Sequence, residues 1–218
     1  MRVAMIGTGV VGQTLGARLV GLGHEVRMGS RHAGGDQAVA WATAAGAAAS
    51  EGTFADAAAF GEVVVNATAG SVSLDALRAA GVGNLSGKVL VDVSNPLDFS
   101  QGFPPTLSVC NTDSAGEQIQ RAFPDARVVK ALNTVTADVM VNPALMPGGH
   151  AVFVCGNDPD AKATVAGLLR GFGWSEGDIV DLGDISNARG LEMYLALWVR
   201  LMGHVRTRHF NIRLVREA

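Results

Sequence analysis

A chain of 218 residues, 48% of them hydrophobic, can bury the core of one α/β domain with a short appendage, so two independent domains are not expected. The formal net charge of -3 gives no basic surface, which argues against nucleic acid or a membrane as a partner and favours small molecules. Cys110 and Cys155 fall in no metal-binding or disulfide spacing, so we expect no metal site and a reducing, cytoplasmic compartment.

Short apolar runs alternate with helical stretches along the chain, the pattern that a parallel sheet with crossover helices produces. We predict strands at residues 3–6, 25–28, 62–67, 88–93, 127–132, 151–155 and 179–182, with a further strand near 47–49 in an alanine-rich stretch. The order of elements indicates an α/β fold, a Rossmann-type doubly wound, mostly parallel sheet, over residues 1–184. A short C-terminal helical extension follows over residues 185–218.

Two predicted helix starts carry capping residues. Ser114 and Glu117 have the spacing of a capping box, and Asp158 precedes a proline at the first helical position. From residue 187 to 205, apolar residues recur at helical spacing and form a broad stripe: Leu191, Tyr194, Leu195, Trp198, Leu201, Met202 and Val205. This width predicts a homodimer contact and a wall of the acceptor pocket; a helix buried within a monomer is the alternative.

A glycine-rich loop directly follows the first predicted strand. Residues 7–12 read Gly-Thr-Gly-Val-Val-Gly, and a helical stretch over 13–22 then leads to the second strand. Gly7 permits a tight turn, Gly9 lets the backbone approach a pyrophosphate, and Gly12 lets the helix pack closely on the strand. The start of the helix offers free N–H groups to phosphate. This βαβ context predicts a dinucleotide site in preference to a glycine-rich turn without a ligand.

The end of the second strand is where such a site selects its dinucleotide. Sites selective for NAD place Asp or Glu there, and that carboxylate would repel the 2′-phosphate of NADP. Here Gly29 takes the position and leaves room for the phosphate, while Ser30 can donate its hydroxyl and Arg31 can pair with the phosphate or stack on adenine. We therefore predict NADP(H) as cofactor, with His32 beside it; the alternative is that Arg31 and His32 are solvated loop residues.

Later strand ends indicate the nicotinamide side, because ligands lie beyond the carboxyl ends of strands in a doubly wound sheet. Small residues after the fourth strand permit close passage of the cofactor: Ala67, Thr68 and Ala69. Asn95 and Pro96 follow the next strand and offer contacts to the ribose or carboxamide, unless Asn-Pro serves only as a turn. Asn133 emerges at the same edge and is a candidate to face the acceptor.

The sequence lacks familiar catalytic motifs of dehydrogenases. Tyr194 is the only tyrosine, and Trp198 stands where the Tyr-x-x-x-Lys pair of short-chain dehydrogenases would need lysine, which excludes that family. The five histidines are scattered, and the sequence identifies no carboxylate partner for any of them. The sequence therefore identifies no catalytic side chain, and which residue acts as proton donor stays open. The reaction then depends on positioning two planar cofactors more than on a protein acid.

Several segments occur together, and in this order, in one known family. They are MRVAMIGTGVVGQTLGARLVGLGHEVRMGSR at the start, KVLVDVSNPL and RVVKALNT in the middle, and VFVCGNDPDAK and DLGDISNARGLE toward the end. Over nearly its whole length the chain resembles the coenzyme F420-dependent NADP oxidoreductases. The resemblance implies hydride transfer between NADPH and the deazaflavin ring of F420, with the C-terminal segment closing the pocket and the dimer. It also implies that NADP is held by Thr8, Gly9, Val10, Val11, Ser30 and Arg31.

The chain departs from archaeal members of that family at two strand ends. They have Pro-Trp after the fourth strand and His-Thr-Ile-Pro after the sixth, whereas residues 69–71 here read Ala-Gly-Ser and residues 133–136 read Asn-Thr-Val-Thr. The acceptor therefore stays open. Coenzyme F420 is the leading candidate; a flavin, a metal chelate or a small carbonyl or imine is the alternative. A noncatalytic NADP(H)-binding regulator is a third hypothesis.

Overall fold

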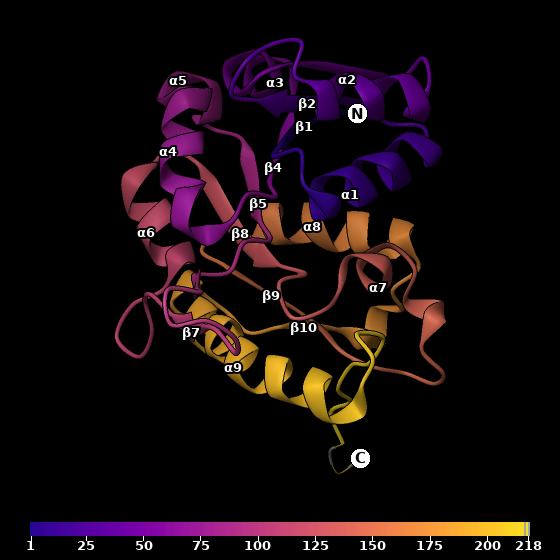
Figure 1. Cartoon of the computed structure of the whole chain (residues 1–218), viewed down its shortest axis with the longest axis vertical. Coiled ribbons are helices and arrows are strands. Elements are labelled where there is room, and N and C mark those ends of the chain that lie inside the picture. The colour runs from indigo at the N-terminus through magenta and orange to yellow at the C-terminus, as the bar shows by residue number, and fades with distance from the viewer. Residues whose placement is uncertain (216, 218) are drawn as a thin grey trace.

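The computed structural model describes residues 1–215 and 217. Within them, eight strands form one sheet in the order β10-β9-β8-β5-β4-β1-β2-β3 (Figure 1). Adjacent strands are parallel except β8 and β9, so β9 and β10 run opposite to the others. The strands are β1 (Arg2–Ile6), β2 (Glu25–Ser30), β3 (Ala49–Thr53), β4 (Val63–Asn66), β5 (Val89–Asp92), β8 (Arg127–Ala131), β9 (Val152–Gly156) and β10 (Ile179–Asp181). The predicted Rossmann-type, mostly parallel sheet is confirmed.

Helices cover both faces of the sheet and close two hydrophobic cores (Figure 1). Successive residues of β1 alternate between the cores, Met5 facing one and Ile6 the other. The first core is covered by α1 (Val10–Gly21), α2 (Asp36–Ala45), α7 (Ala137–Val141) and α8 (Pro159–Phe172). The second is covered by α3 (Phe54–Phe60), α4 (Gly70–Ala80), α5 (Val82–Leu85), α6 (Ala115–Ala122) and α9 (Ala188–Val205).

Strand ends differ from the predicted ones where pairing continues beyond an apolar run. β2 continues to Ser30 because Gly29 and Ser30 pair with Gly52 and Thr53 of β3. A strand in this stretch is confirmed, but β3 lies at Ala49–Thr53 and so begins only at the end of the predicted 47–49. It is an edge strand, mostly half-buried, without apolar alternation. A hairpin of β6 (Leu97–Asp98) and β7 (Thr106–Leu107) has strands too short to leave a periodic pattern.

The two predicted helix caps differ in outcome. Asp158 accepts a hydrogen bond from the Ala161 N–H at 2.7 Å, and Pro159 begins α8, as predicted. At α6, the Ser114 hydroxyl accepts from the Glu117 N–H at 3.1 Å. The Glu117 carboxylate, however, accepts from the Ser114 hydroxyl and from Arg189 of α9. Only the serine half of the predicted capping box forms, because a tertiary ion pair takes the carboxylate.

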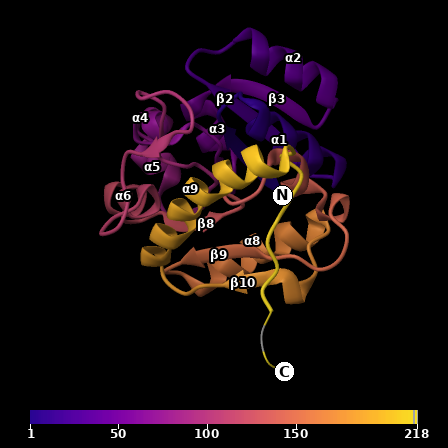
Figure 2. The ribbon, with the colours of Figure 1, turned by 60° about the horizontal axis from the view of Figure 1, so that its bottom comes forward.

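Helix α9 lies across the molecule, and the tail descends from its end toward β9 and β10 (Figure 2). The helix has 18 residues and ends at Arg206, whose φ is 55°. Beyond it, Phe210 stacks on Trp198 with ring centroids 5.1 Å apart. The Ala151 N–H then donates to the Ile212 carbonyl at 2.9 Å, which fixes the tail beside β9. Neither α9 nor any other helix in the described part of the chain is both long enough and apolar enough to cross a membrane.

Candidate cofactor site

The glycine-rich loop joins β1 to α1 in a geometry suited to a phosphate group. Gly7 has a φ of 117°, where side chains are strained. A Cβ on Gly12 would lie 2.3 Å from the Gly7 carbonyl oxygen, so only glycine lets α1 approach the loop this closely. A Cβ on Gly9 would meet nothing within 4 Å, and α1 starts there without a side-chain cap or an acidic first turn. The first N–H groups of α1 are therefore free to bind an anion.

A cavity of about 430 Å³ adjoins this loop and the ends of β2 and β4. It brings together predicted residues from three separate segments: Gly7, Thr8, Gly9, Ser30, Arg31, His32, Ala67, Thr68 and Ala69. Residues 35–38, at the start of α2, and Phe54 complete the lining. Sequence reasoning missed these residues because the alanine-rich stretch carries no motif. The Thr8 hydroxyl donates to Gln37 Oε1 at 3.0 Å, which ties the loop to α2.

The residue that faces this cavity from the end of β2 is Ser30, not Gly29. A Cβ on Gly29 would lie 3.0 Å from the Cβ of Ala57 and 3.1 Å from the Cα of Phe54, so Gly29 faces α3. Ser30 lines the cavity because neighbouring residues of a strand face opposite sides. The interpretation of Gly29 as the position that leaves room for a phosphate was therefore wrong. Absence of an acid at position 30 is what leaves that room.

A second cavity, of about 240 Å³, adjoins the first residues of α1, which directly follow the loop. Its lining includes four of the predicted residues: Val10, Val11, Asn95 and Asn133. Helix α9 supplies Leu195 and Trp198 to the wall. Residues 7–9 of the loop line the first cavity and residues 10–11 of α1 line the second, so the junction of the glycine loop with α1 borders both.

Gly12 and Pro96 are the two predicted residues that line neither cavity. Both residues instead pack against elements that form the site. Gly12 packs on the loop as described, and a Cβ on Gly70 would lie 2.8 Å from the Cα of Pro96. Pro96 therefore packs against the start of α4, and direct cofactor contacts for these two residues stay predictions.

Asn95 and Asn133 form a reciprocal amide pair beside the second cavity. The Asn95 Nδ2 group donates to the Asn133 carbonyl at 2.9 Å, and Asn133 Nδ2 donates to Asn95 Oδ1 at 2.9 Å. Asn133 Nδ2 also donates to the Leu191 carbonyl of α9 at 3.1 Å. Asn133 Oδ1 and Thr134 Oγ1 are buried without a hydrogen-bond partner among the described residues. Such orphaned polar atoms next to a cavity are the ones that a ligand amide or carbonyl would satisfy.

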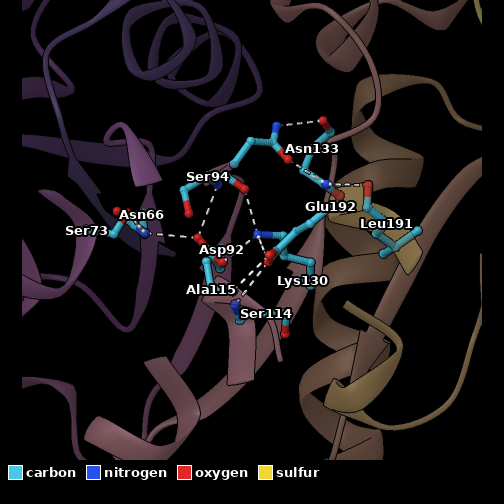
Figure 3. A network of polar contacts seen from close by, with 12 residues as sticks. Asn66, Ser73, Asp92, Ser94, Ser114, Ala115, Lys130, Asn133, Leu191 and Glu192 are labelled. Atoms are coloured by element: carbon cyan, nitrogen blue, oxygen red, sulfur yellow. Dashed lines mark hydrogen bonds and ion pairs between the residues drawn. The ribbon is translucent and has the colours of Figure 1, made fainter. Parts of the chain in front are cut away.

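A buried ion network lies next to this amide pair (Figure 3). The Lys130 ammonium lies 2.8 Å from Asp92 Oδ2 and 2.8 Å from Glu192 Oε1, and all three side chains are at most 1% exposed. Burial lowers the pKa of Lys130, but the two carboxylates raise it more, so its pKa stands above the ordinary value and the group is charged. Sequence reasoning missed this network. The available signal was a charged residue within each of two apolar runs, VLVDV and RVVKAL.

Among the described residues, His32 and Asp36 are the only His, Cys, Asp, Glu, Lys or Tyr side chains that line either cavity, and both line the first. His209 pairs with Asp138 at 3.0 Å on the surface, and His150 is bound to the Pro143 carbonyl at 3.0 Å. Burial raises the pKa of the Cys155 thiol to about 12, so it is not a nucleophile at neutral pH. Over residues 1–215 and 217, no three His, Cys, Asp or Glu side chains are grouped to hold a metal ion.

Comparison with known proteins identifies the family. Residues 2–96 match the family described as coenzyme F420-dependent NADP oxidoreductase. The crystal structure of a candidate F420-dependent NADP reductase from Arthrobacter sp. FB24 is 51% identical, with a TM-score of 0.94, and covers 99% of this chain and 100% of that one. The chain belongs to the coenzyme F420-dependent NADP oxidoreductase family. It is an NADP-dependent oxidoreductase.

More distant relatives share the scaffold. The metalloreductase STEAP3 of Rattus norvegicus is 31% identical over 195 residues, which are 88% of this chain and 36% of that protein. The chain thus spans about a third of the length of this curated relative. A hypothetical protein from Sinorhizobium meliloti, SMa0349, is 25% identical with a TM-score of 0.67 and 86% of each chain covered.

The oxidoreductase differs from archaeal members of its family at the second cavity. The residues of that departure, 133–136, line the second cavity. In this structure the Asn133 amide is held by Asn95, which follows β5, and by the Leu191 carbonyl of α9, so these two neighbours fix its orientation. The departure therefore changes the polar group that borders the second cavity.

Proposed function

We propose that this oxidoreductase transfers a hydride between NADP(H) in the first cavity and the deazaflavin ring of coenzyme F420 in the second. The observation that carries the proposal is that consecutive residues line the two cavities: residues 7–9 of the glycine loop line the first, and residues 10–11, at the start of α1, line the second. Ligands in both would meet beside this loop. Hydride transfer needs such close approach of two rings and little else from the protein.

The residues of the first cavity fit NADP. The free N–H groups at the start of α1 suit the pyrophosphate, and the open space at Gly9 permits its approach. Ser30, Arg31 and His32 offer a hydroxyl and basic side chains to the 2′-phosphate. Asp36 is the one carboxylate among the lining residues of this cavity; it lies at the start of α2, and the end of β2 carries no acid.

The residues of the second cavity fit a planar ring with a polar edge. Val10, Val11, Leu195 and Trp198 supply apolar contacts that exclude water from the reacting carbon. Asn133 and Thr134 supply polar atoms for ring carbonyl or N–H groups. NADPH, when bound, supplies the hydride, and no protein acid is needed if the acceptor ring stabilises the transferred charge itself.

An acceptor panel tests the proposal. NADPH absorbance is followed with F420, FMN and a ferric chelate, and we expect turnover with F420 at a kcat/KM at least about tenfold above that with the others. The 31% identity to a metalloreductase makes ferric chelate the second candidate. Faster reduction of the chelate or of FMN would make that compound the acceptor in place of F420. Tight NADPH binding without any turnover would favour a noncatalytic regulator.

We further propose that α9 forms the contact of a homodimer. Met193, Leu197 and Val205 are 36%, 55% and 45% exposed, and with the half-buried Leu201 they recur every four residues along one stripe. Such a stripe is self-complementary about a twofold axis.

Leu197→Asp is expected to give a folded monomer, because it places a charge in the centre of the proposed interface and leaves the core intact. Light scattering measures the mass, with Leu145→Asp, an exposed leucine outside α9, as control. A monomeric wild type at micromolar concentration would contradict the proposed dimer. Trp198 is a poor test of the interface because it stacks on Phe210 and lines the second cavity.

A further inference from the structure

We infer that Glu192 and Lys130 are positioning residues for the acceptor: they fix α9 and the Asn95–Asn133 pair to the ends of β5 and β8, and thereby set the shape of the second cavity. The inference rests on the proposed function, because it assigns that cavity to the acceptor. Neither side chain is part of the lining of the cavity, so both act through other residues.

One ammonium group joins three elements of the fold (Figure 3). Lys130 of β8 donates to Asp92 Oδ2 of β5 at 2.8 Å and to the Ser94 carbonyl at 2.6 Å, and it pairs with Glu192 of α9 at 2.8 Å. These contacts occupy all the N–H groups of the lysine. Glu192 also accepts from the N–H groups of Ala115 and Gly116, at 2.8 and 3.0 Å. A single residue thus ties α9 to the sheet and to the start of α6.

Two residues of the ion network are sequence neighbours of residues that form the amide pair or hold it in place. Ser94 directly precedes Asn95, and Leu191, whose carbonyl accepts from Asn133, directly precedes Glu192. One and two turns further along α9, Leu195 and Trp198 line the cavity. A shift of Glu192 would therefore move the amide pair and the apolar wall together.

Stability alone does not account for these charges. Two carboxylates and one ammonium leave a net negative charge in a core where Lys130 lies opposite the buried Cys155. The desolvation of such groups offsets much of their attraction, and well-packed apolar side chains are often equally stabilising. Ionic hydrogen bonds have a defined direction, so a fully satisfied set of them fixes one geometry. Here that geometry lies at the border of the acceptor cavity.

Glu192→Gln is the decisive variant, because it keeps the side-chain shape and leaves Asp92 and Lys130 as a neutral pair. We expect kcat/KM for the acceptor to fall about 10- to 100-fold, as misplaced binding groups do. The Kd for NADPH, measured by its fluorescence without acceptor, should stay within about threefold of wild type. Asp92→Asn removes the same charge but keeps α9 bound to Lys130, so a smaller loss of turnover is expected.

Arg189→Met is the matched control. It breaks an ion pair of 2.6 Å between the same two helices, α9 and α6, but Arg189 has no bond to the amide pair or to Lys130. Turnover of this variant should equal that of wild type. If Glu192→Gln fails to fold, the same measurements are made on the triple variant Asp92→Asn, Lys130→Met and Glu192→Gln, which leaves no charge in this network.

All variants are assayed with whichever acceptor the wild type reduces. A wild type that reduces FMN or ferric chelate but not F420 overturns the proposed acceptor and leaves this inference to be judged on the variants. Equal losses of kcat/KM in Glu192→Gln and Arg189→Met would overturn the inference. So would equal losses in Glu192→Gln and Asp92→Asn, since the buried charge and not the tie to α9 would then be responsible.

Discussion

Lys130→Met, made alone, is expected to lower the free energy of unfolding by about 3 to 5 kcal/mol. The change removes the one cation between Asp92 and Glu192 and leaves two carboxylates fully buried, with the Ser94 carbonyl deprived of its donor. A loss of this size approaches the whole stability of many domains. We therefore expect the variant to be mostly unfolded at 37 °C.

The measurement is urea unfolding followed by circular dichroism, with Lys162→Met as the matched control. Lys162 also makes an ion pair of 2.8 Å, but its partner Asp181 is 52% exposed, so water can solvate the carboxylate that remains. The control should lose only about 0 to 1 kcal/mol. Similar losses in the two variants would mean that burial of the network is not what makes it sensitive.

Arg31→Ala is expected to weaken NADPH binding about 10- to 100-fold and to leave NADH binding almost unchanged. Arg31 lines the first cavity next to Ser30 after β2, whereas the glycine loop proposed for the pyrophosphate, which both cofactors share, follows β1. Removal of the guanidinium therefore affects only the cofactor that carries a 2′-phosphate. Binding titrations with the two cofactors measure the ratio, and Arg78→Ala, whose arginine pairs with Asp75 on α4, is the control.

Ser30→Asp should act in the opposite sense on the two cofactors. A carboxylate at this position would repel the 2′-phosphate and accept hydrogen bonds from the ribose hydroxyls of NADH. Gly29→Asp would not serve, because its side chain would meet Ala57 and Phe54 instead of the cofactor. Retained preference for NADPH in Ser30→Asp would count against the proposed phosphate subsite.

The first cavity illustrates how far sequence reasoning reaches. The segment from Gly7 to Gly12 could be recognised from local sequence alone. Its turn needs glycine at position 7 and its close helix contact needs glycine at position 12, only five residues later. The error at Gly29 has a nonlocal cause. β2 extends to Ser30 only because β3 pairs with it, and β3 has no strand pattern of its own.

The sequence by itself determined the class of sheet, the glycine loop, the helix start at Asp158 and the segments that converge on the first cavity. These features depend on apolar runs and on residues close together in the chain. Only the tertiary structure decided that Lys130 meets Asp92 across 38 positions and that Glu192 of an amphipathic helix faces inward. The local sequence around a charged residue does not reveal its partner, because the same pattern is compatible with a solvated side chain and with one that is buried beside a counter-charge distant in the chain.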